Sequence, residues 1–488
     1  MKQIEEAVKY FSEENFIEAE KLSLGILFKN PEDNDAIDVL AAIFIRTGHL
    51  VFLETVTKKN IAILIALGKF LYNLKTFEHA LVIFKKIQEL DKRDYNNLNN
   101  LGLTYENLDM NEEALQAFEK SIKITPSYPA IYNLGVLHRE NKNIEKSLLY
   151  LKRALQLNPQ DVYAHYSLGM TYLINKDFEN GYKYFVKRPI DGIQNLKNDW
   201  DKKAHPDKDI LVFCEYGLGD ALMFSRYFSL LKPLFKTVKV CCHSALHTLF
   251  RNSFSDIEFV SSFETTTYDY SVCAMNLPYY LNLDFDNIPV SEGYLVADEE
   301  KIQEFKNKYF DTNKLKVGIF YIGGEQNKRN ARHRAIELRQ LAPLLTLDNI
   351  QLYSFQKDDL LEELKEFPQI IDLGKTFNDF SDTAAAMKNL DIMVTIDSSP
   401  AHLAGALGVK TLLLLPLFSE WRWFTDETQT PWYNSVELIR QTALANWTSA
   451  VEKVCKKLND YSSIWYFGGS VFGTTVLKTG TIGGGSCW

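Results

Sequence analysis

The chain has 488 residues, of which 46% are hydrophobic and 24% charged, a composition typical of a globular protein with roughly two to four domains. The formal net charge of -9 and the pI near 5.6 exclude a general nucleic-acid binder, because binding to a phosphate backbone needs a basic surface. No run approaches the ~20 apolar residues of a membrane-spanning helix, and the six cysteines show neither CxxC nor Cys/His metal spacing, so we predict no transmembrane segment, no zinc site and no disulfide framework.

The first residues, MKQIEEAVKYF, are charged and amphipathic and lack the apolar core of a secretory signal, so we expect a cytoplasmic protein. Residues 1–190 then repeat themselves. A Leu-Gly pair recurs at spacings of 34, 33 and 34 residues, with its glycine at Gly68, Gly102, Gly135 and Gly169. This is the tetratricopeptide period, and it predicts an α-solenoid of about five to six repeats.

The residues that follow each Leu-Gly pair support this prediction. They are a small residue and then an apolar one: Ala80 and Phe84, Ala114 and Phe118, Ser147 and Leu151, Gly181 and Phe185. The glycine lets the first helix of a repeat pass close to the second, and the apolar side chain fills the remaining gap. The concave face of such a stack is expected to bind a protein or peptide partner. Its asparagines and tyrosines, such as Asn100 and Asn133, either bind peptide backbone or are solvated.

The repeat pattern ends between Pro189 and Lys208, where we place a domain boundary. Residues 207–310 are predicted to form a doubly wound α/β lobe, with strands near 210–214, 238–242, 257–260 and 270–273. The first strand leads through a glycine turn, with Gly217 and Gly219, into an amphipathic helix.

Residues 314–460 are predicted to form a second lobe of the same kind. Its first strand starts at Lys316 and is followed by a basic turn, a helix at 337–345, a strand at 350–356 and a helix at 379–389. A helix at 446–458 is expected to close the lobe. Two such blocks imply two lobes that face a cleft, so the predicted fold class is α + α/β. Residues 461–488 are rich in Gly, Ser, Thr and aromatic residues, and we interpret them as a flexible tail or a segment packed on a neighbouring surface.

Residues 390–416 of the second lobe read as strand, polar turn, small-residue helix and strand: LDIMVTI, the turn from Asp397 to Pro400, AHLAGALG and VKTLLLLP. A helix N-terminus at the carboxyl end of a parallel strand presents N–H groups and a partial positive charge, which suit a phosphate. We interpret it as a nucleotide-diphosphate site, and an ordinary strand-to-helix corner is the alternative. The candidate donor-binding residues are Asp397, Ser398, Ser399, His402 and Leu403.

Three segments together resemble a known family. They are EYGLGDALMFSRY near 215, GIFYIGGEQNKRNARHRAI from 318, and the stretch 379–408, which starts DFSDTAAAMKNLDIMVTI, ends AHLAGALG and is followed by EWRWF, PWY and IRQ. All three are similar to bacterial tetratricopeptide-fused glycosyltransferases. The catalytic part of that family is similar to ADP-heptose:lipopolysaccharide heptosyltransferases of glycosyltransferase family nine, which have a GT-B fold. The resemblance covers roughly residues 165–458. It implies that the carboxyl-terminal lobe holds the nucleotide sugar and the amino-terminal lobe the acceptor.

The resemblance implies that Asp220 is the general base, whereas from the residues alone it reads equally well as a helix cap. Glu215 is the reserve candidate, and Tyr216 stands where the family usually has glutamine. For the leaving diphosphate, the turn from 328 to 334 carries five basic groups, among them Lys328, Arg332 and Arg334. No DxD pair ends a strand convincingly, so we expect a metal-independent mechanism without a cofactor.

Two further pairs of residues are open to two interpretations each. Asp379 and Asp382 either cap the helix that follows them or contact ribose, and Thr383 is a candidate base or sugar contact. Trp421 and Arg422 either contact a base or sugar or wedge the lobes. We expect a glycosyltransferase that moves a sugar from a nucleotide-diphospho-sugar to an acceptor, a protein or peptide selected by the repeats. The alternative is a scaffold whose repeats bind partners and whose GT-B domain is inactive.

Overall fold

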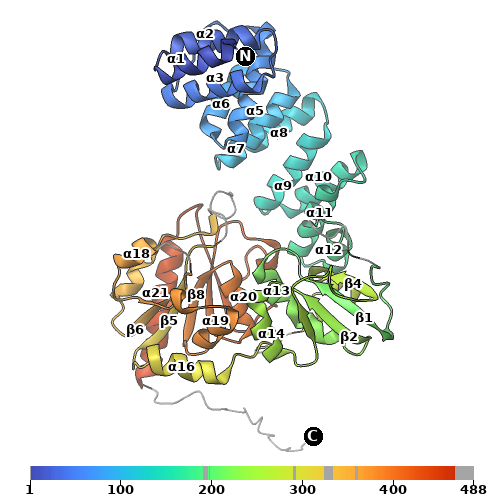
Figure 1. Ribbon diagram of the computed structural model, residues 1–488, viewed down its shortest axis with the longest axis vertical. Coiled ribbons are helices and arrows are strands. Elements are labelled where there is room, and N and C mark those ends of the chain that lie inside the picture. The colour runs from blue at the N-terminus through green and yellow to red at the C-terminus, as the bar shows by residue number, and fades with distance from the viewer. Residues whose placement is uncertain are drawn as a thin grey trace, which may run out of the picture. The chain divides into compact units, whose positions relative to one another are not determined.

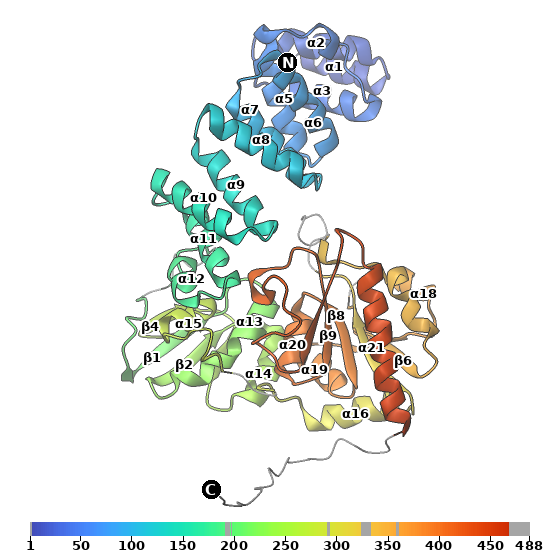
Figure 2. The same ribbon diagram turned by 180° about the vertical axis from the view of Figure 1, so that it is seen from behind.

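The computed structural model describes residues 2–190, 196, 198–289, 293–323, 333–357 and 361–467. The chain divides into two compact units, and each unit combines segments that are distant in sequence (Figures 1 and 2). Unit 1 consists of Met1–Asn195, Asn276–Asn287 and Phe418–Asp426, and unit 2 consists of Leu196–Met275, Ile288–Leu417 and Glu427–Trp488. Within the described part of the chain, no helix is long and apolar enough to cross a membrane.

Unit 1 is a series of helix pairs. Its helices are α1 (Lys2–Ser12), α2 (Phe16–Leu27), α3 (Asn34–Thr47), α4 (Phe52–Thr55), α5 (Ile61–Asn73), α6 (Phe77–Leu90), α7 (Tyr95–Asn107), α8 (Asn111–Ile124), α9 (Tyr128–Glu140), α10 (Ile144–Leu157), α11 (Val162–Ile174) and α12 (Phe178–Phe185), with a 3₁₀ turn η1 (Lys58–Asn60) before α5. Aspartates begin several first helices. For example, Asp94 accepts the Asn97 N–H at 2.9 Å and Asp161 accepts the Ala164 N–H at 2.7 Å.

The predicted close approach of paired helices is confirmed. A Cβ added at Gly68 would lie 2.6 Å from Cε1 of Phe84, and a Cβ at Gly102 would collide with the ring of Phe118. Both rings are buried. Each glycine therefore leaves the space that the aromatic ring of the second helix fills, as the repeat pattern requires.

Two segments from the predicted α/β lobes belong to unit 1. One contains α15 (Leu277–Tyr280), and the other contains the 3₁₀ turn η7 (Trp421–Trp423). Trp421 is buried, with its ring 6.4 Å from that of Tyr182 and 5.7 Å from that of Phe185. These apolar contacts cover the last helix pair, whose rings would otherwise face water. The predicted lobe ranges 207–310 and 314–460 therefore each include a segment that belongs to unit 1.

Unit 2 contains two parallel sheets. The first has the strand order β3-β2-β1-β4, so the order reverses between β1 and β4. Its strands are β1 (His205–Phe213), β2 (Phe235–Cys241), β3 (Glu258–Val260) and β4 (Tyr270–Cys273). Its helical segments are α13 (Leu218–Phe224), η2 (Ser225–Leu231), η3 (Ser244–Leu246), α14 (His247–Ser253) and η4 (Ala274–Asn276), the last of which runs into unit 1.

The second sheet has the order β10-β9-β8-β5-β6-β7, which reverses between β5 and β8. Its strands are β5 (Leu315–Phe320), β6 (Ile350–Ser354), β7 (Ile371–Asp372), β8 (Ile392–Ile396), β9 (Thr411–Leu415) and β10 (Val436–Arg440). Its helical segments are α16 (Glu299–Tyr309), η5 (Leu338–Thr346), α18 (Leu361–Lys365), η6 (Gly374–Thr376), α19 (Phe380–Met387), α20 (Ser399–Ala406) and α21 (Thr448–Phe467). Every residue of β8 and β9 is buried, as expected for central parallel strands.

The predicted fold class is confirmed: a helical repeat region is followed by two doubly wound parallel α/β lobes. Two details differ from the prediction. The helix expected at 337–345 is the 3₁₀ segment η5, which contains Pro343, a residue without the N–H that an α-helix interior needs. The helix expected to end near 458 continues to Phe467, so the segment expected as a tail from 461 begins as helix, and 468–488 lie outside the described residues.

Candidate functional site

Both sheets of unit 2 have a topological switch point, where the strand order reverses. In open α/β sheets, ligands bind in the crevice outside the carboxyl ends of the strands at this point. In the first sheet, residues 214–217 follow β1 and 274–275 follow β4. In the second, residues 321–323 follow β5 and 397–399 follow β8. The two motifs that the sequence analysis singled out, the glycine turn EYGLGD and the polar turn with its candidate donor-binding residues, therefore lie at the two switch points.

The turn after β8 is held closely by its neighbours. Ser398 is fully extended, with φ -162° and ψ 178°, and its hydroxyl donates to the Ile396 carbonyl at 3.3 Å. A Cβ added at Gly323, which follows β5, would lie 3.2 Å from Cβ of Ser398. Pro400 in the first turn of α20 has no N–H to leave unsatisfied. The first turn of α20 thus begins at the edge of this crevice, with the polarity that attracts anions.

Arg334 lies beside this turn. Its NH1 is 3.3 Å from the carbonyl oxygen of Asp397 and 3.6 Å from the Asp397 carboxylate. Asp397 is buried, so this carboxylate holds the guanidinium in place rather than presenting a surface to a phosphate. The predicted phosphate contacts Lys328 and Arg332 lie outside the described residues.

His402 and Leu403 are more enclosed than a ligand contact requires. The His402 side chain is only 4% exposed, and its Nδ1 lies 2.9 Å from the hydroxyl of Tyr433. Burial raises the pKa of Tyr433 well above its usual value, so this hydroxyl keeps its proton. The Leu403 side chain is fully buried, so only its backbone is available to a ligand.

The glycine turn of the first lobe places two carboxylates differently. Glu215 is buried, and its Oε1 accepts the N–H of Met275 at 3.1 Å, which ties the carboxyl end of β1 to that of β4. Asp220 is half-buried in the first turn of α13, and its Oδ2 accepts the Gly217 N–H at 3.3 Å. Between them, Tyr216 is 57% exposed and has φ +64°, a conformation that costs a non-glycine residue energy. Such strain is common at functional sites.

The glycine turn and the turn after β8 lie against each other. A Cβ added at Gly219 would be 3.0 Å from Cδ2 of His402, 3.4 Å from Cα of Ser399 and 3.5 Å from N of Ser399. Figures 1 and 2 show α13 beside α20. The first turns of two helices, one from each lobe, therefore meet at a glycine, and residues predicted as acceptor-side and donor-side are brought together.

Sequence reasoning missed Arg226, which supports this contact. Arg226 is buried, and its NH1 donates to the Trp432 carbonyl at 2.8 Å. Its guanidinium lies 4.8 Å from the ring centres of Tyr294 and Tyr433. Since Tyr433 also bonds His402, these groups link η2 to α20 across the two lobes. The available signal was an arginine within the otherwise apolar run ALMFSRYFSLL.

Asp379 caps α19, since its side chain accepts the N–H of Asp382 at 3.3 Å, and Asp382 and Thr383 lie in the first turn of this helix. The Asp382 carboxylate accepts from Lys301 Nζ at 2.6 Å and from both the N–H and the side-chain amide of Asn378 at 2.9 Å. Burial would raise the pKa of Asp382, but these hydrogen bonds outweigh it and lower the pKa. Thr383 Oγ1 donates to the Asp379 carbonyl at 3.2 Å. Of the two interpretations, these contacts favour capping over a ribose contact.

Trp421 and Arg422 belong to unit 1, whereas the two sheets of the lobes belong to unit 2. Trp421 packs against the rings of α12 described above, and Arg422 NH1 donates to Glu420 Oε2 at 2.7 Å. Their packing supports a structural role instead of stacking on a base. Across the described ranges, no group of three or more His, Cys, Asp or Glu side chains could hold a metal ion.

Comparisons with known proteins each match only a part of the chain. Residues 95–128 and 129–161 each match a model of the tetratricopeptide repeat. A stretch of 79 residues, 16% of this chain, is 35% identical to the E3 ubiquitin-protein ligase CHIP of Arabidopsis thaliana, and the chain spans only 28% of the length of that relative.

Two solved structures are each similar to about half of this chain. The ADP-heptose lps heptosyltransferase II of E. coli is 16% identical, with a TM-score of 0.39, over 52% of this chain and 98% of that one. The glycosyl transferase family 9 protein from Veillonella parvula DSM 2008 is 14% identical, with a TM-score of 0.40, over 54% of this chain and 99% of that one. Residues 95–161 of this chain are tetratricopeptide repeats.

Proposed function

We propose that unit 2 transfers a sugar from a nucleoside-diphosphate sugar to an acceptor hydroxyl group. One observation carries the proposal: Gly219 brings the first turn of α13 against the first turn of α20, and each turn follows the switch point of its own sheet. Asp220, a carboxylate, directly follows this glycine, and the start of α20 carries a partial positive charge. Glycosyl transfer needs this pair, a base and a group that stabilises the leaving diphosphate.

In the proposed reaction the acceptor oxygen attacks the anomeric carbon, and the bond from that carbon to the diphosphate oxygen breaks. Asp220 takes the proton from the acceptor hydroxyl. The diphosphate leaves with an additional negative charge, which the N–H groups at the start of α20 and the Arg334 guanidinium stabilise. We propose that Lys328 and Arg332 add positive charge here and that no metal ion takes part.

The proposed acceptor is a protein or peptide that the tetratricopeptide repeats of unit 1 select. Repeat stacks offer an extended surface that suits a peptide in an open conformation.

The proposal is tested first by donor binding. The full chain is heated with ADP-, GDP- and UDP-sugars, and one nucleotide class should raise the melting temperature in a concentration-dependent way. If none does, the scaffold with an inactive α/β part becomes the better description.

The second test uses Asp220→Asn, which keeps an oxygen for the Gly217 N–H but cannot take a proton. This variant should retain the thermal shift and lose roughly 100-fold or more in donor turnover. Asp207→Asn, an exposed aspartate of the same lobe, serves as the control and should keep full turnover. Unchanged turnover in Asp220→Asn would remove the assignment of the base.

A further inference from the structure

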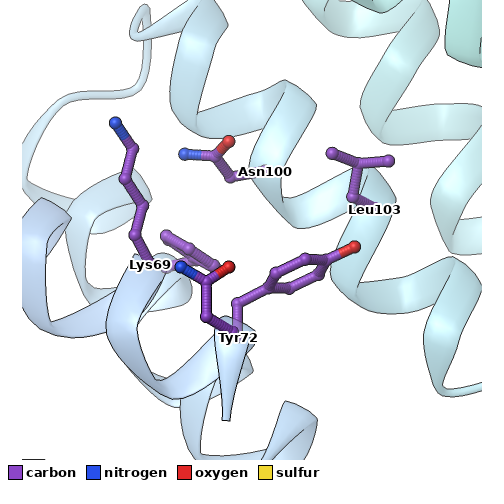
Figure 3. A pocket seen from close by; sticks show the side chains of 6 residues that line it. Lys69, Tyr72, Asn100 and Leu103 are labelled. Carbon is purple, nitrogen blue, oxygen red and sulfur yellow. The ribbon is translucent and has the colours of Figure 1, made fainter. Parts of the chain in front are cut away.

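A small pocket lies between two successive repeats of unit 1. Lys69, Tyr72 and Asn73 line it from α5, Phe84 from α6, and Asn100 and Leu103 from α7. Figure 3 shows Lys69 and Tyr72 on one helix, with Asn100 and Leu103 on another, around the same space. The pocket has a volume of about 140 Å³. Lys69, Tyr72, Asn73 and Asn100, four of the six lining side chains, are polar, which is unusual for a gap between packed repeat helices.

The Tyr72 hydroxyl is oriented as a hydrogen-bond donor toward any ligand. The side-chain amide nitrogen of Asn107 donates to this hydroxyl at 3.0 Å and to the Leu103 carbonyl at 2.9 Å. Because a carbonyl only accepts, the second bond identifies this atom as the amide nitrogen. Burial, and to a lesser degree the charge of Glu106, raises the pKa of Tyr72, so the hydroxyl keeps its proton.

The remaining polar side chains of the pocket have unused hydrogen-bonding capacity. In the described part of the chain, Lys69, Asn73 and Asn100 make no side-chain hydrogen bond, and Lys69 makes no ion pair. Lys69 can only donate, and each asparagine has an NH₂ group to donate. One ammonium, one hydroxyl and two amides therefore border a single space, and each of them can donate a hydrogen bond.

The size and chemistry of the pocket select its ligand. Small-molecule sites occupy ~300–1,000 Å³, so the pocket is too small for a nucleotide or a sugar nucleotide. Liquid water takes ~30 Å³ per molecule, so there is room for roughly five non-hydrogen atoms, about one short side chain. A carboxylate has only acceptor oxygens, which matches a lining of donors and one positive charge.

We propose that this pocket binds the carboxylate of a glutamate or aspartate side chain in an extended peptide that lies along the repeats. Lys69 supplies the charge, Tyr72 and Asn100 supply hydrogen bonds from opposite helices, and Leu103 contacts the methylene groups. That this peptide is the acceptor of the sugar rests on the proposed function. In that case, the pocket selects acceptors that carry an acidic residue.

The test measures peptide selection by the full chain. An array of random 12-residue peptides with amidated ends is probed with the wild type, Lys69→Gln and Lys69→Glu. Bound peptides should be enriched in Glu or Asp at one position for the wild type. Lys69→Gln should lose this enrichment, and Lys69→Glu should replace it by Lys or Arg. Lys59→Gln, which removes an equally exposed lysine just before α5, should keep the wild-type preference.

A solution measurement quantifies the effect. The best peptide should bind the wild type about 5- to 10-fold more tightly than the same peptide with Gln in place of Glu, and Lys69→Gln and Asn100→Ala should bind both versions equally. An array without acidic enrichment, an enrichment that survives Lys69→Gln, or binding that requires a free carboxyl terminus instead of the side chain would each overturn the proposal.

The outcome is separable from the test of the proposed function, because no donor is present in the binding assay. Selection of acidic peptides without any sugar-nucleotide turnover would support the carboxylate pocket and contradict the proposed sugar transfer. Turnover with no preference for acidic peptides would support the sugar transfer and contradict the carboxylate pocket.

Discussion

Replacing Gly219 by alanine is expected to disturb the contact between α13 and α20. The new methyl group would lie 3.0 Å from Cδ2 of His402 and 3.4 Å from Cα of Ser399, closer than most side chains tolerate. The imidazole cannot turn away, because it is buried and its Nδ1 is bonded to Tyr433. The two helices must therefore separate by a few tenths of an ångström.

Two opposing terms set the magnitude of the effect on stability. Overpacking costs about 1–3 kcal/mol, and alanine in place of glycine within a helix returns about 1 kcal/mol. The net loss of roughly 1 kcal/mol should lower the melting temperature by about 2–4 °C for a domain of this size. Donor turnover should fall further, by about tenfold, because catalysis is sensitive to sub-ångström displacement of reacting groups.

The matched control is Gly217→Ala, two residues earlier. Gly217 has φ -89°, which any residue adopts, and the nearest atom to an added Cβ is Asp220 Oδ2 at 3.6 Å. This variant should keep the melting temperature and turnover of the wild type. The melting temperature is measured by differential scanning fluorimetry, and turnover is measured as hydrolysis of the sugar nucleotide that stabilises the chain. Equal effects of the two substitutions would refute the reasoning from close contact.

Three further predictions concern stability. Because hydrogen bonds from Lys301 and Asn378 lower the pKa of Asp382, its contribution is present above the unfolded-state pKa of about 3.9 and is lost as the pH falls through the lower folded-state pKa. Urea unfolding at pH 7 and pH 3 should therefore show a smaller loss of stability on acidification for Asp382→Asn than for the wild type. Trp421→Ala should lower the free energy of unfolding of unit 1 by about 3–5 kcal/mol, measured from the helical circular dichroism signal. A loss below about 1 kcal/mol would contradict the burial of Trp421 on α12. Lys75 has φ +63°, so Lys75→Gly should leave the melting temperature of unit 1 unchanged or raise it by up to a few degrees, and a fall would contradict the strain assigned to this turn.

The parts of the fold that depend on neighbouring residues follow from the sequence. The repeat period predicts helix pairs because Gly68 and Phe84, which pack against each other, lie on consecutive helices joined by a short turn. The segment around β8, α20 and β9 carries its own signals, and β9 (Thr411–Leu415) lies within the stretch VKTLLLLP that was predicted as a strand. Such signals act over a few residues and therefore survive without knowledge of the tertiary structure.

Features that depend on distant residues could not be predicted in this way. Nothing near His402 in the sequence indicates that its imidazole bonds Tyr433, 31 residues later. The same holds for Arg226, which meets the Trp432 carbonyl through tertiary packing alone. Asp382 looked equally suited to a cap and to a ribose, and only the position of Lys301 on α16 decides between them. Side-chain partners, more than strands and helices, are what the sequence leaves open.

The division of the chain into three-segment units limits how it can be cut or recombined. A break near residue 190 would remove Trp421 and Phe285 from the helices that they cover and leave the rings of Phe178 and Phe185 facing water. Both fragments would then carry apolar surface that promotes aggregation. The repeat module is thus not a cassette that can be exchanged at one junction. A functional exchange between related chains would have to carry the segments 276–287 and 418–426 along with the repeats.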